Sequence, residues 1–595
     1  MLAQQDLDKS FPGLLTLIIK RFNIKDSVIQ KLLNYLLTST QQGHTSVRIA
    51  DFIQDSQLNI SPDEIKDKLR DYKLVSDQEK SLASLLVLDE GKIYLRRHFN
   101  QDLSVANKLT SLISQKPIDL SSHFSEEIIK SANLSELQKL AIKKALNSKV
   151  FLLTGSPGTG KTLSLAAIIY CICDLNNRKI INDRVIVAAP TAKAVARIRE
   201  SFNDLIALNP GVGTYQPKFV TLHKILRFGY YEVNPRANKY DPLGCEWLLI
   251  DEASMLSLDL FYWLLGATSE HTRLILNGDK NQLPAISSGA PFRDLIEAVK
   301  SPALLGKVSE LVSDEDSTIT KNGEANLPFK AVELTKNYRQ QNHTRIVLQE
   351  IQKLFSQEHQ GENKINEVLA LFEQDNNENI SHLSQPENIK SLLSATIDIA
   401  KHLQSIENPA DMLKQAHETI ILTFARHGNN GCESFNNYVR SALTKRGASK
   451  DKQGKDIYHG LPFIIKKNDY HNNLRNGDLG VFYEKDNQLK AMIAGSKGQL
   501  IEKSPAVISD FAASYAITVH ESQGSEFPKV NLVLTEEDAH LNSLELLYTG
   551  LSRFRESIKI YGTKESLKKC LATSADRQSG LTKQIVNKLN AWINA

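Results

Sequence analysis

One octapeptide of this chain has the residue types and the spacing that hold phosphate groups. It consists of Gly155, Ser156, Pro157, Gly158, Thr159, Gly160, Lys161 and Thr162, between an apolar run and a helix-forming stretch. Glycines let backbone N–H groups curl around phosphate oxygens, the start of a helix adds positive potential, and the lysine reaches the terminal phosphates. We therefore predict that these residues bind a nucleoside triphosphate, with Lys161 on the phosphates and the Thr162 hydroxyl on a Mg²⁺ ion.

Further polar side chains follow two other apolar runs that resemble strands. Asp251 and Glu252 come directly after residues 247–250, and Gln282 follows residues 273–276. We predict that Asp251 belongs to the metal shell, that Glu252 polarises the attacking water and that Gln282 senses the γ-phosphate. Taken singly, adjacent acids often cap helices, and a lone glutamine is ordinarily a surface amide.

Gln138 lies about one helix before the octapeptide, in the sequence Ser135-Glu-Leu-Gln. This is the pattern of a capping box, in which the glutamine closes the first turn of a helix. Its amide, with a donor and an acceptor side by side, can also recognise the edge of adenine. The two roles are compatible, and the sequence alone leaves both open.

Short apolar runs separated by helical patterns must position these side chains. Such runs lie at residues 150–154, 185–189, 247–250 and 273–276, and they resume after about residue 415. The alternation predicts an α/β fold with parallel strands covered by helices, continued in a second unit that carries a small β insertion. Residues 1 to about 115 have helical spacing and no catalytic signature.

The composition excludes several classes of protein. The 595 residues suffice for about four domains, and 41% hydrophobic with 24% charged residues is the mixture of folded globular chains. The net charge of +4 is too small to indicate a nucleic-acid partner by itself. Five scattered cysteines without a CxxC pair argue against a disulfide frame or a zinc site. With no signal-like start and no apolar run of about 18 residues, we expect a cytoplasmic protein without membrane spans.

Together with five further motifs, these residues resemble superfamily 1 helicases. The octapeptide, residues 251–254 and residues 278–284 correspond to helicase motifs I, II and III. The other matching segments are residues 189–197, 221–223, 337–339, 519–527 and 548–553, in the order that the family has. Within the superfamily the sequence is most similar to RecD, the alpha subunit of exodeoxyribonuclease V (RecBCD), from about residue 130 to about residue 560.

The resemblance implies an α/β fold and an activity. The expected domains are a helical N-terminal domain that docks to partners (residues 1–115) and two RecA-like P-loop motor domains (residues 116–335 and 336–595). The second motor domain would carry a β-barrel insertion at about residues 430–510. With ATP and Mg²⁺ as cofactors, the chain would move 5′ to 3′ on single-stranded DNA. It would do so in a heterotrimer with RecB and RecC that unwinds double-strand DNA ends for recombinational repair.

The resemblance also implies site residues beyond the octapeptide. Arg339 and Arg553 would face ATP across a cleft, where a guanidinium can stabilise the charge of the transferring phosphoryl group. Gly524 and Glu526 would complete the nucleotide site, with Glu526 accepting a hydrogen bond from a ribose hydroxyl. The residues expected to contact the DNA strand are Thr191, Lys193, Arg197, Thr221, His223, Thr518 and His520.

Two other hypotheses remain open. A nucleotide-gated scaffold that joins RecB and RecC without translocating would not need the full set of Lys161, Asp251, Glu252, Gln282, Arg339 and Arg553. A stand-alone or conjugative helicase would act without two large partners. No carboxylate–lysine cluster suited to phosphodiester cleavage is evident in the sequence, so we expect any nuclease centre to lie in a partner.

Overall fold

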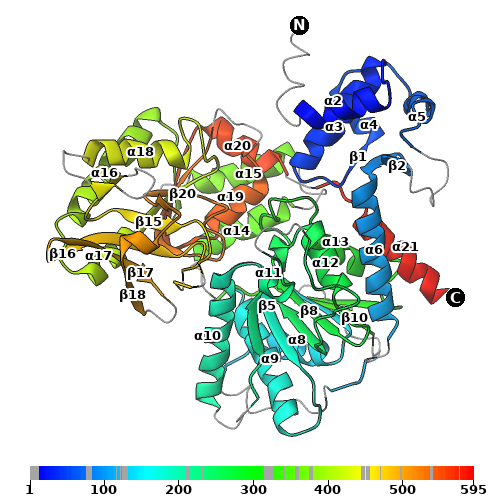
Figure 1. Cartoon of the computed structure of the whole chain (residues 1–595), viewed down its shortest axis with the longest axis horizontal. Helices are drawn as coiled ribbons and strands as arrows, with labels where there is room; N and C mark the ends of the chain where they lie inside the picture. The colour runs from blue at the N-terminus through cyan, green and yellow to red at the C-terminus, as the bar shows by residue number, and fades with distance from the viewer. Residues whose placement is uncertain are drawn as a thin grey trace.

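The fold is that of a computed structural model of the chain (Figure 1). The structure describes residues 12–75, 84–115, 117–120, 122, 132–209, 215–229, 234–313, 327–338, 342–355, 361–373, 380–443, 449–450, 456–469, 471–472, 474–495, 499–535, 541–574 and 577–595. In these ranges no helix combines the length and the apolar character needed to cross a membrane.

A seven-stranded parallel sheet forms the first unit, residues 132–338. Its strand order is β6-β5-β7-β8-β4-β10-β9. The strands are β4 (Val150–Gly155), β5 (Val185–Ala189), β6 (Lys218–Thr221), β7 (Trp247–Ile250), β8 (Arg273–Gly278), β9 (Ser309–Ser313) and β10 (Phe329–Leu334). The helices are α8 (Glu136–Leu146), α9 (Lys161–Asn177), α10 (Ala192–Leu208), α11 (Leu222–Ile225), α12 (Leu258–Gly266) and α13 (Pro291–Lys300).

The apolar runs of the sequence are the central strands of this sheet. Successive side chains point to opposite faces, so Leu152 and Leu248 join one core while Phe151 and Leu249 join the other. Both faces are covered, which is why these strands are continuously apolar rather than alternating. The predicted α/β class with parallel strands is confirmed.

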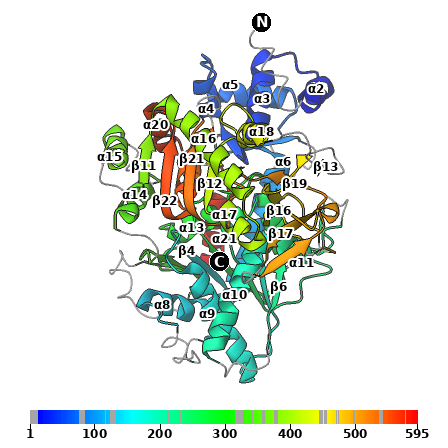
Figure 2. The ribbon, with the colours of Figure 1, turned by 90° about the vertical axis from the view of Figure 1, so that its left-hand side faces the viewer.

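A five-stranded parallel sheet forms the second unit, residues 342–574, in the order β11-β22-β21-β12-β20 (Figure 2). The strands are β11 (Ile380–Leu383), β12 (Thr419–Thr423), β20 (Ala516–Thr518), β21 (Phe527–Val533) and β22 (Phe554–Tyr561). The helices are α14 (Asn342–Lys353), α15 (Glu362–Phe372), α16 (Pro386–Leu403), α17 (Pro409–Ala416), α18 (Cys432–Leu443), α19 (Leu544–Leu551) and α20 (Lys564–Ala572).

An antiparallel sheet is inserted in the second unit between β12 and β20. Its order is β18-β17-β16-β15-β19, with β15 (Pro462–Ile465), β16 (Leu479–Lys485), β17 (Gln488–Ala494), β18 (Leu500–Lys503) and β19 (Phe511–Ala513). Phe463 stacks on Phe482 with ring centroids 4.3 Å apart, and Phe511 closes this core. A separate two-stranded ladder pairs β13 (Ser449–Lys450) with β14 (Asp456–Ile457). Among the described strands the pairing is that of an open sheet, with β18 and β19 at its edges.

The N-terminal region combines helices with a small sheet that the helical spacing did not predict. The helices α2 (Pro12–Arg21), α3 (Ser27–Gln41), α4 (Ile49–Asp55) and α5 (Pro62–Asp71) share one apolar core. The strands β1 (Ser46–Arg48), β2 (Leu86–Asp89) and β3 (Lys92–Leu95) pair in the antiparallel order β1-β3-β2. The two-residue turn Glu90-Gly91 has positive φ at both positions, the geometry of a tight hairpin.

Helices from both ends of the chain complete the core of the first unit. Helix α6 (Arg96–Ile113) and helix α21 (Leu581–Ile593) pack against each other and lie side by side in Figure 1. Leu109 of α6 and Ile585 of α21 are fully buried in the same core as the first sheet. The predicted division into three consecutive segments did not include this return of the C-terminus to the first unit.

Candidate nucleotide site between the two units

The phosphate-binding loop runs from the end of β4 into α9. Gly158 and Gly160 have φ values of 85° and 84°, in the left-handed region that glycine adopts without strain. The Nζ atom of Lys161 donates to the carbonyl oxygens of Gly155 (2.6 Å) and Ser156 (2.9 Å). The ammonium therefore lies inside the curve of the loop, where phosphate oxygens would replace the carbonyls as its partners.

Gln138 is buried and forms the predicted capping box. Its Oε1 accepts from the backbone N–H of Ser135 (2.9 Å), and its own N–H donates to the Ser135 hydroxyl (3.3 Å). The Nε2 side of the amide contacts Gly160 so closely that a Cβ there would collide with it. The structure thus contains the predicted capping box, and the Gln138 side chain also touches the phosphate-binding loop.

The carboxylate pair lies beyond the end of β7, beside the loop. Asp251 is buried, and its Oδ1 accepts from the Asn277 amide (2.7 Å) and from the Glu252 N–H (2.9 Å). Burial, reinforced by the charge of Glu252, raises the pKa of Asp251 to about 7. Glu252 itself has φ +52°, a strained backbone for a residue with a side chain, which is common at functional sites.

Gln282 reaches a second buried carboxylate rather than the surface. Its Nε2 donates to Oδ2 of Asp279 (3.1 Å), and the hydroxyl of Tyr548 from the second unit donates to the same oxygen (3.2 Å). Burial raises the pKa of Asp279, whereas the charge of Lys161 acts in the opposite direction. Gln282, the predicted γ-phosphate sensor, is therefore linked through Asp279 to Tyr548 of the second unit.

Arg553 is almost fully buried between the units. It follows the end of α19. Its Nε donates to Thr549 O (3.0 Å), and one of its terminal nitrogens donates to Ser552 Oγ (2.7 Å). Burial lowers its pKa, while Glu252 and Asp279 of the first unit favour its charged form. Arg553 thus belongs to the same electrostatic cluster as the predicted catalytic carboxylate.

Two cations predicted to bind DNA contact Ser525 and Glu526 of the second unit. Lys193 Nζ donates to Ser525 Oγ (2.6 Å), and Arg197 forms an ion pair with Glu526 (2.9 Å). The other oxygen of Glu526 pairs with Arg555 (3.3 Å). Glu526, expected at the ribose, is therefore held from both units.

The segment before Arg339 lies on the phosphate-binding loop. The Asn337 amide donates to Pro157 O (2.9 Å), and the Tyr338 N–H donates to Gly158 O (2.9 Å). Arg339 itself lies outside the described residues. Asn337 and Tyr338 thus hold the chain against the phosphate-binding loop just before Arg339 in the sequence.

The remaining predicted strand-contacting residues lie at the ends of strands in both units. Thr191 caps α10, where its hydroxyl accepts from the Ala194 N–H (3.2 Å). Thr221 ends β6, and the exposed His223 follows it on α11. Burial lowers the pKa of His520 to about 4, so this half-buried ring is neutral near pH 7.

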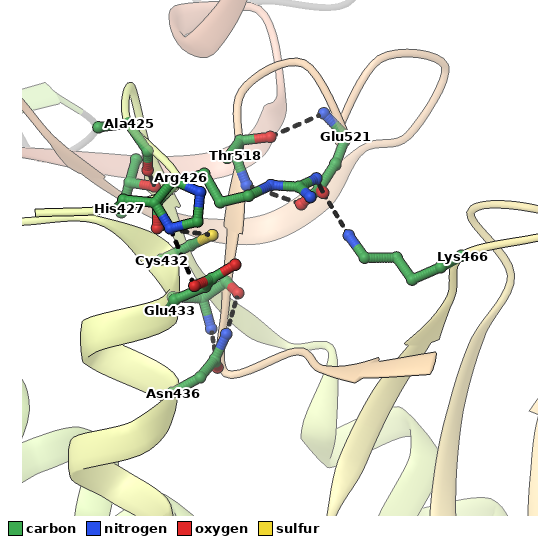
Figure 3. A network of polar contacts seen from close by, with 11 residues as sticks. Ala425, Arg426, His427, Cys432, Glu433, Asn436, Lys466, Thr518 and Glu521 are labelled. Carbon is green, nitrogen blue, oxygen red and sulfur yellow. Dashed lines mark hydrogen bonds and ion pairs between the residues drawn. The ribbon is translucent and has the colours of Figure 1, made fainter. Parts of the chain in front are cut away.

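Thr518 belongs to a polar network at the end of β20 (Figure 3). Its N–H donates to Glu521 (3.2 Å), and its hydroxyl accepts from the Glu521 N–H (3.3 Å). Glu521 also pairs with Arg426 (2.5 Å) and with Lys466. The threonine predicted to contact a strand is thus placed beside two cations that could meet phosphates.

The sequence interpretation missed five residues of the site. They are Asn277, Asp279, Ser525, Tyr548 and Thr549. Each lies inside or next to a recognised motif, so the motif was the available signal. What the motif could not show is the partner, because the bonds to Asp279 and Ser525 link residues more than 260 positions apart.

The donor atoms near the loop fit a Mg²⁺ ion. Mg²⁺ prefers hard oxygen ligands and is usually held by one or two carboxylates or hydroxyls together with substrate phosphates. Among the described hydrogen bonds, both that reach the Asp251 side chain use Oδ1, which leaves Oδ2 for a ligand. Thr162 is half-buried at the start of α9. A cation beside Asp251 would also lower its raised pKa.

Two family models match this chain. Residues 138–288 match a model described as an AAA domain, and residues 513–558 match the UvrD-like helicase C-terminal domain. The first match spans the phosphate-binding loop and the carboxylates, and the second spans the segment that contains Ser525 and Arg553.

Curated relatives resemble most of the chain. The RecBCD enzyme subunit RecD of Haemophilus influenzae is 27% identical over 76% of this chain and 72% of its own length. The RecD subunit of Buchnera aphidicola (Schizaphis graminum) is 25% identical over 91% of this chain and 94% of its own. The ATP-dependent RecD2 DNA helicase of Deinococcus radiodurans is 25% identical over 80% of this chain and 56% of its own.

Among solved structures, Bacteroides Pif1 bound to single-stranded DNA aligns with 72% of this chain and 92% of its own, with 18% identity and a TM-score of 0.39. The two family-model matches define the class: an AAA domain followed by a UvrD-like helicase C-terminal domain. The curated relatives identify the type within that class and confirm the predicted resemblance. The chain is an ATP-dependent helicase of the RecD type.

Proposed function

We propose that the chain is the ATP-driven motor subunit of a RecBCD-like helicase–nuclease that moves 5′ to 3′ along single-stranded DNA at double-strand ends, in the cytoplasm. The names of its relatives, RecBCD enzyme subunit RecD and ATP-dependent RecD2 DNA helicase, support this assembly and this substrate. The N-terminal region would dock to RecB and RecC. The antiparallel insertion, which stands where the β-barrel was predicted and pairs as an open sheet among the described strands, would brace the DNA, and the nuclease centre would lie in a partner.

One observation carries the proposal: three hydrogen bonds join the segment of Gln282 to the second unit next to Arg553. The Leu283 N–H donates to the Thr549 hydroxyl (3.0 Å), and the Gln523 amide donates to Leu283 O (3.1 Å). The Tyr548 hydroxyl donates to Asp279, the partner of Gln282 (3.2 Å). A change at the terminal phosphate can therefore be transmitted directly to the second unit.

The proposed hydrolysis uses residues of both units. Lys161 binds the terminal phosphates, Glu252 orients and polarises the attacking water, and Gln282 responds to the γ-phosphate. Arg553 approaches from the second unit, and Arg553 and Arg339 stabilise the negative charge of the transferring phosphoryl group. Loss of that charge after hydrolysis weakens the attraction between the units and lets the cleft reopen.

The proposed binding site holds the remaining parts of the nucleotide. Gln138 contacts adenine through its Nε2 side, and Glu526 with Gly524 contacts the ribose. Thr162 and Asp251 would hold Mg²⁺, which neutralises charge on the phosphates when it is bound.

The proposed DNA path follows the strand ends of both units. Thr191, Thr221 and His223 would contact it from the first unit, and Thr518 and His520 from the second. Because His520 is neutral near pH 7, it would contact a base or accept a hydrogen bond rather than pair with a phosphate. Arg426 and Lys466 beside Thr518 would supply positive charge to the backbone.

The test is ATP hydrolysis and unwinding by the complex reconstituted with RecB and RecC. Lys161→Gln should abolish DNA-stimulated ATP hydrolysis by this subunit and leave assembly intact, because the lysine ammonium donates to carbonyl oxygens of its own phosphate-binding loop. The control is Lys143→Gln, an exposed lysine of α8. Hydrolysis by RecB and RecC assembled without this subunit is measured in parallel and subtracted. Unwinding should require a 5′ overhang.

Two outcomes would favour other hypotheses. Loss of assembly in Lys161→Gln, with no DNA-stimulated hydrolysis in the parent, would support the nucleotide-gated scaffold. Failure to co-assemble with RecB and RecC, with full activity of the isolated chain, would support a stand-alone helicase.

A further inference from the structure

Ser525 and Glu526 form a bridge between helix α10 of the first unit and Arg553 of the second. On the first-unit side, Lys193 Nζ donates to Ser525 Oγ (2.6 Å) and Arg197 pairs with Glu526 Oε1 (2.9 Å). On the second-unit side, a terminal nitrogen of Arg553 donates to Ser525 O (3.4 Å). The Phe527 N–H donates to Arg553 O (2.9 Å), which fixes the backbone of the arginine to the same segment.

The second-unit side of the bridge is buried, the Arg197 side chain is 38% exposed, and the charges of Arg197 and Glu526 are complementary. Ser525 and Arg553 expose only 6% and 5% of their surface, and the Glu526 side chain exposes 9%. Burial opposes the charge of Arg197, but Glu526 more than offsets it and raises the pKa of the guanidinium, with Glu252 and Asp251 adding to the effect. Glu526 also pairs with Arg555 of its own unit (3.3 Å).

Lys193 and Arg197 both contact side chains of the second unit. Arg197 also lies within the electrostatic reach of Glu252 and Asp251, the carboxylates predicted to serve hydrolysis. The two residues are also one helical turn apart, so α10 presents them on one face.

We propose that Lys193 and Arg197 are positioning residues for ATP hydrolysis: through Ser525 and Glu526 they orient Arg553 toward the transferring phosphoryl group. The inference deepens the proposed function and rests on it, because it assumes that Arg553 acts on ATP. When the units close, α10 fixes the backbone that carries Arg553, and when they separate, the arginine loses that support. DNA that moves α10 would thereby change the rate of hydrolysis.

The experiment compares Arg197→Met with Arg199→Met in the full chain. Arg199 is an exposed arginine of the same helix, which lies over Phe219 and has no part in the bridge. Steady-state ATP hydrolysis at saturating oligo(dT) gives kcat and KM, and fluorescence anisotropy with labelled oligo(dT) gives the DNA affinity and its salt dependence. Arg197→Met should lower kcat by at least about 10-fold and change the DNA Kd by less than about 2-fold. Arg199→Met should leave both unchanged.

A double-mutant cycle decides whether Arg197 acts through Arg553. In an Arg553→Ala background, Arg197→Met should cause little further loss of kcat, because the group that it positions is absent. Arg197→Lys, which keeps a cation near Glu526, should recover part of the kcat and so exclude a mere folding defect. Additive losses in the cycle would overturn the proposal. So would a DNA Kd raised about 10-fold, with a salt slope lower by about one and an unchanged kcat.

The same measurements separate this inference from the proposed function. If Arg553→Ala alone leaves kcat unchanged, the assignment of Arg553 to hydrolysis fails, and the positioning role fails with it. If Arg553→Ala abolishes turnover while Arg197→Met and Lys193→Met do not lower it, only the positioning role fails.

Discussion

The hydroxyl of Tyr548, on helix α19 of the second unit, donates a 3.2 Å hydrogen bond to Oδ2 of Asp279, beyond the end of β8 in the first unit. The same oxygen accepts from Gln282, and the tyrosine oxygen itself accepts from Gln352 (2.8 Å). Asp279 is buried, so each of these partners matters to its charge. The proposed phosphate sensor and the helix that precedes Arg553 therefore share one carboxylate.

Tyr548→Phe should weaken this connection between the units. It removes the hydrogen bond to Asp279 and leaves the Gln352 amide without this acceptor, which we expect to lower the free energy of unfolding by about 1–2 kcal/mol. DNA-stimulated kcat should fall more than the KM for ATP rises. Thermal unfolding and steady-state kinetics measure the two effects. Tyr438→Phe, at an exposed site on α18, is the control, and equal kinetics in both variants would contradict the link.

Gly160→Ala should abolish tight nucleotide binding. Gly160 has φ +84°, which strains any residue with a Cβ, and a Cβ there would collide with the Gln138 amide, so this side chain must leave its present contact with the loop. The control is Gly306→Ala, which has the same kind of strain (φ +77°) but no heavy atom near the added Cβ. In a fluorescent-ATP titration, Gly160→Ala should weaken affinity by at least about 10-fold, whereas Gly306→Ala should bind like the parent. Equal affinity in both would refute the predicted contact.

Asp294→Asn should change the pH dependence of stability. Asp294 of α13 is buried, and burial, followed by the charge of Glu297, raises its pKa from 3.8 to about 7. Because the folded pKa lies above the unfolded one, this carboxyl contributes stability at low pH that is lost as the pH rises through about 7. The free energy of unfolding of Asp294→Asn, relative to that of the parent, should therefore rise by up to about 4 kcal/mol from pH 4 to pH 8.

Urea unfolding of parent and variant across this pH range measures that difference. The exposed Asp71→Asn serves as the control, because its carboxyl has little burial to relieve. A parent and an Asp294→Asn variant with parallel stability curves would contradict a raised pKa at this site.

The sequence predicted the parts of this molecule that depend on local pattern. The glycines and Lys161 of the loop, and the position of Asp251 after its strand, follow from residues that are neighbours in the chain. Continuously apolar strands likewise indicated a sheet that is covered on both faces.

What the sequence could not predict depends on pairing between distant residues. Arg197 carries the charge expected of a DNA-binding residue, and its contact with Glu526, 329 positions away, cannot be read from the sequence. The packing of Ile585, near the C-terminus, in the core of the first unit likewise depends on contacts between residues far apart in the sequence. The small N-terminal sheet was missed for a different reason: its strands are only three or four residues long, too short for a clear alternation.

The most direct test of the account is ATP hydrolysis by Arg553→Ala and Arg553→Lys at saturating single-stranded DNA. If the second unit supplies this charge to the transferring phosphoryl group, kcat should fall by about 10³-fold or more in Arg553→Ala while ATP still binds. Arg553→Lys should recover little, because a lysine does not reproduce the planar guanidinium. Turnover in Arg553→Ala within a few-fold of the parent would contradict the central claim that hydrolysis takes place between the two units.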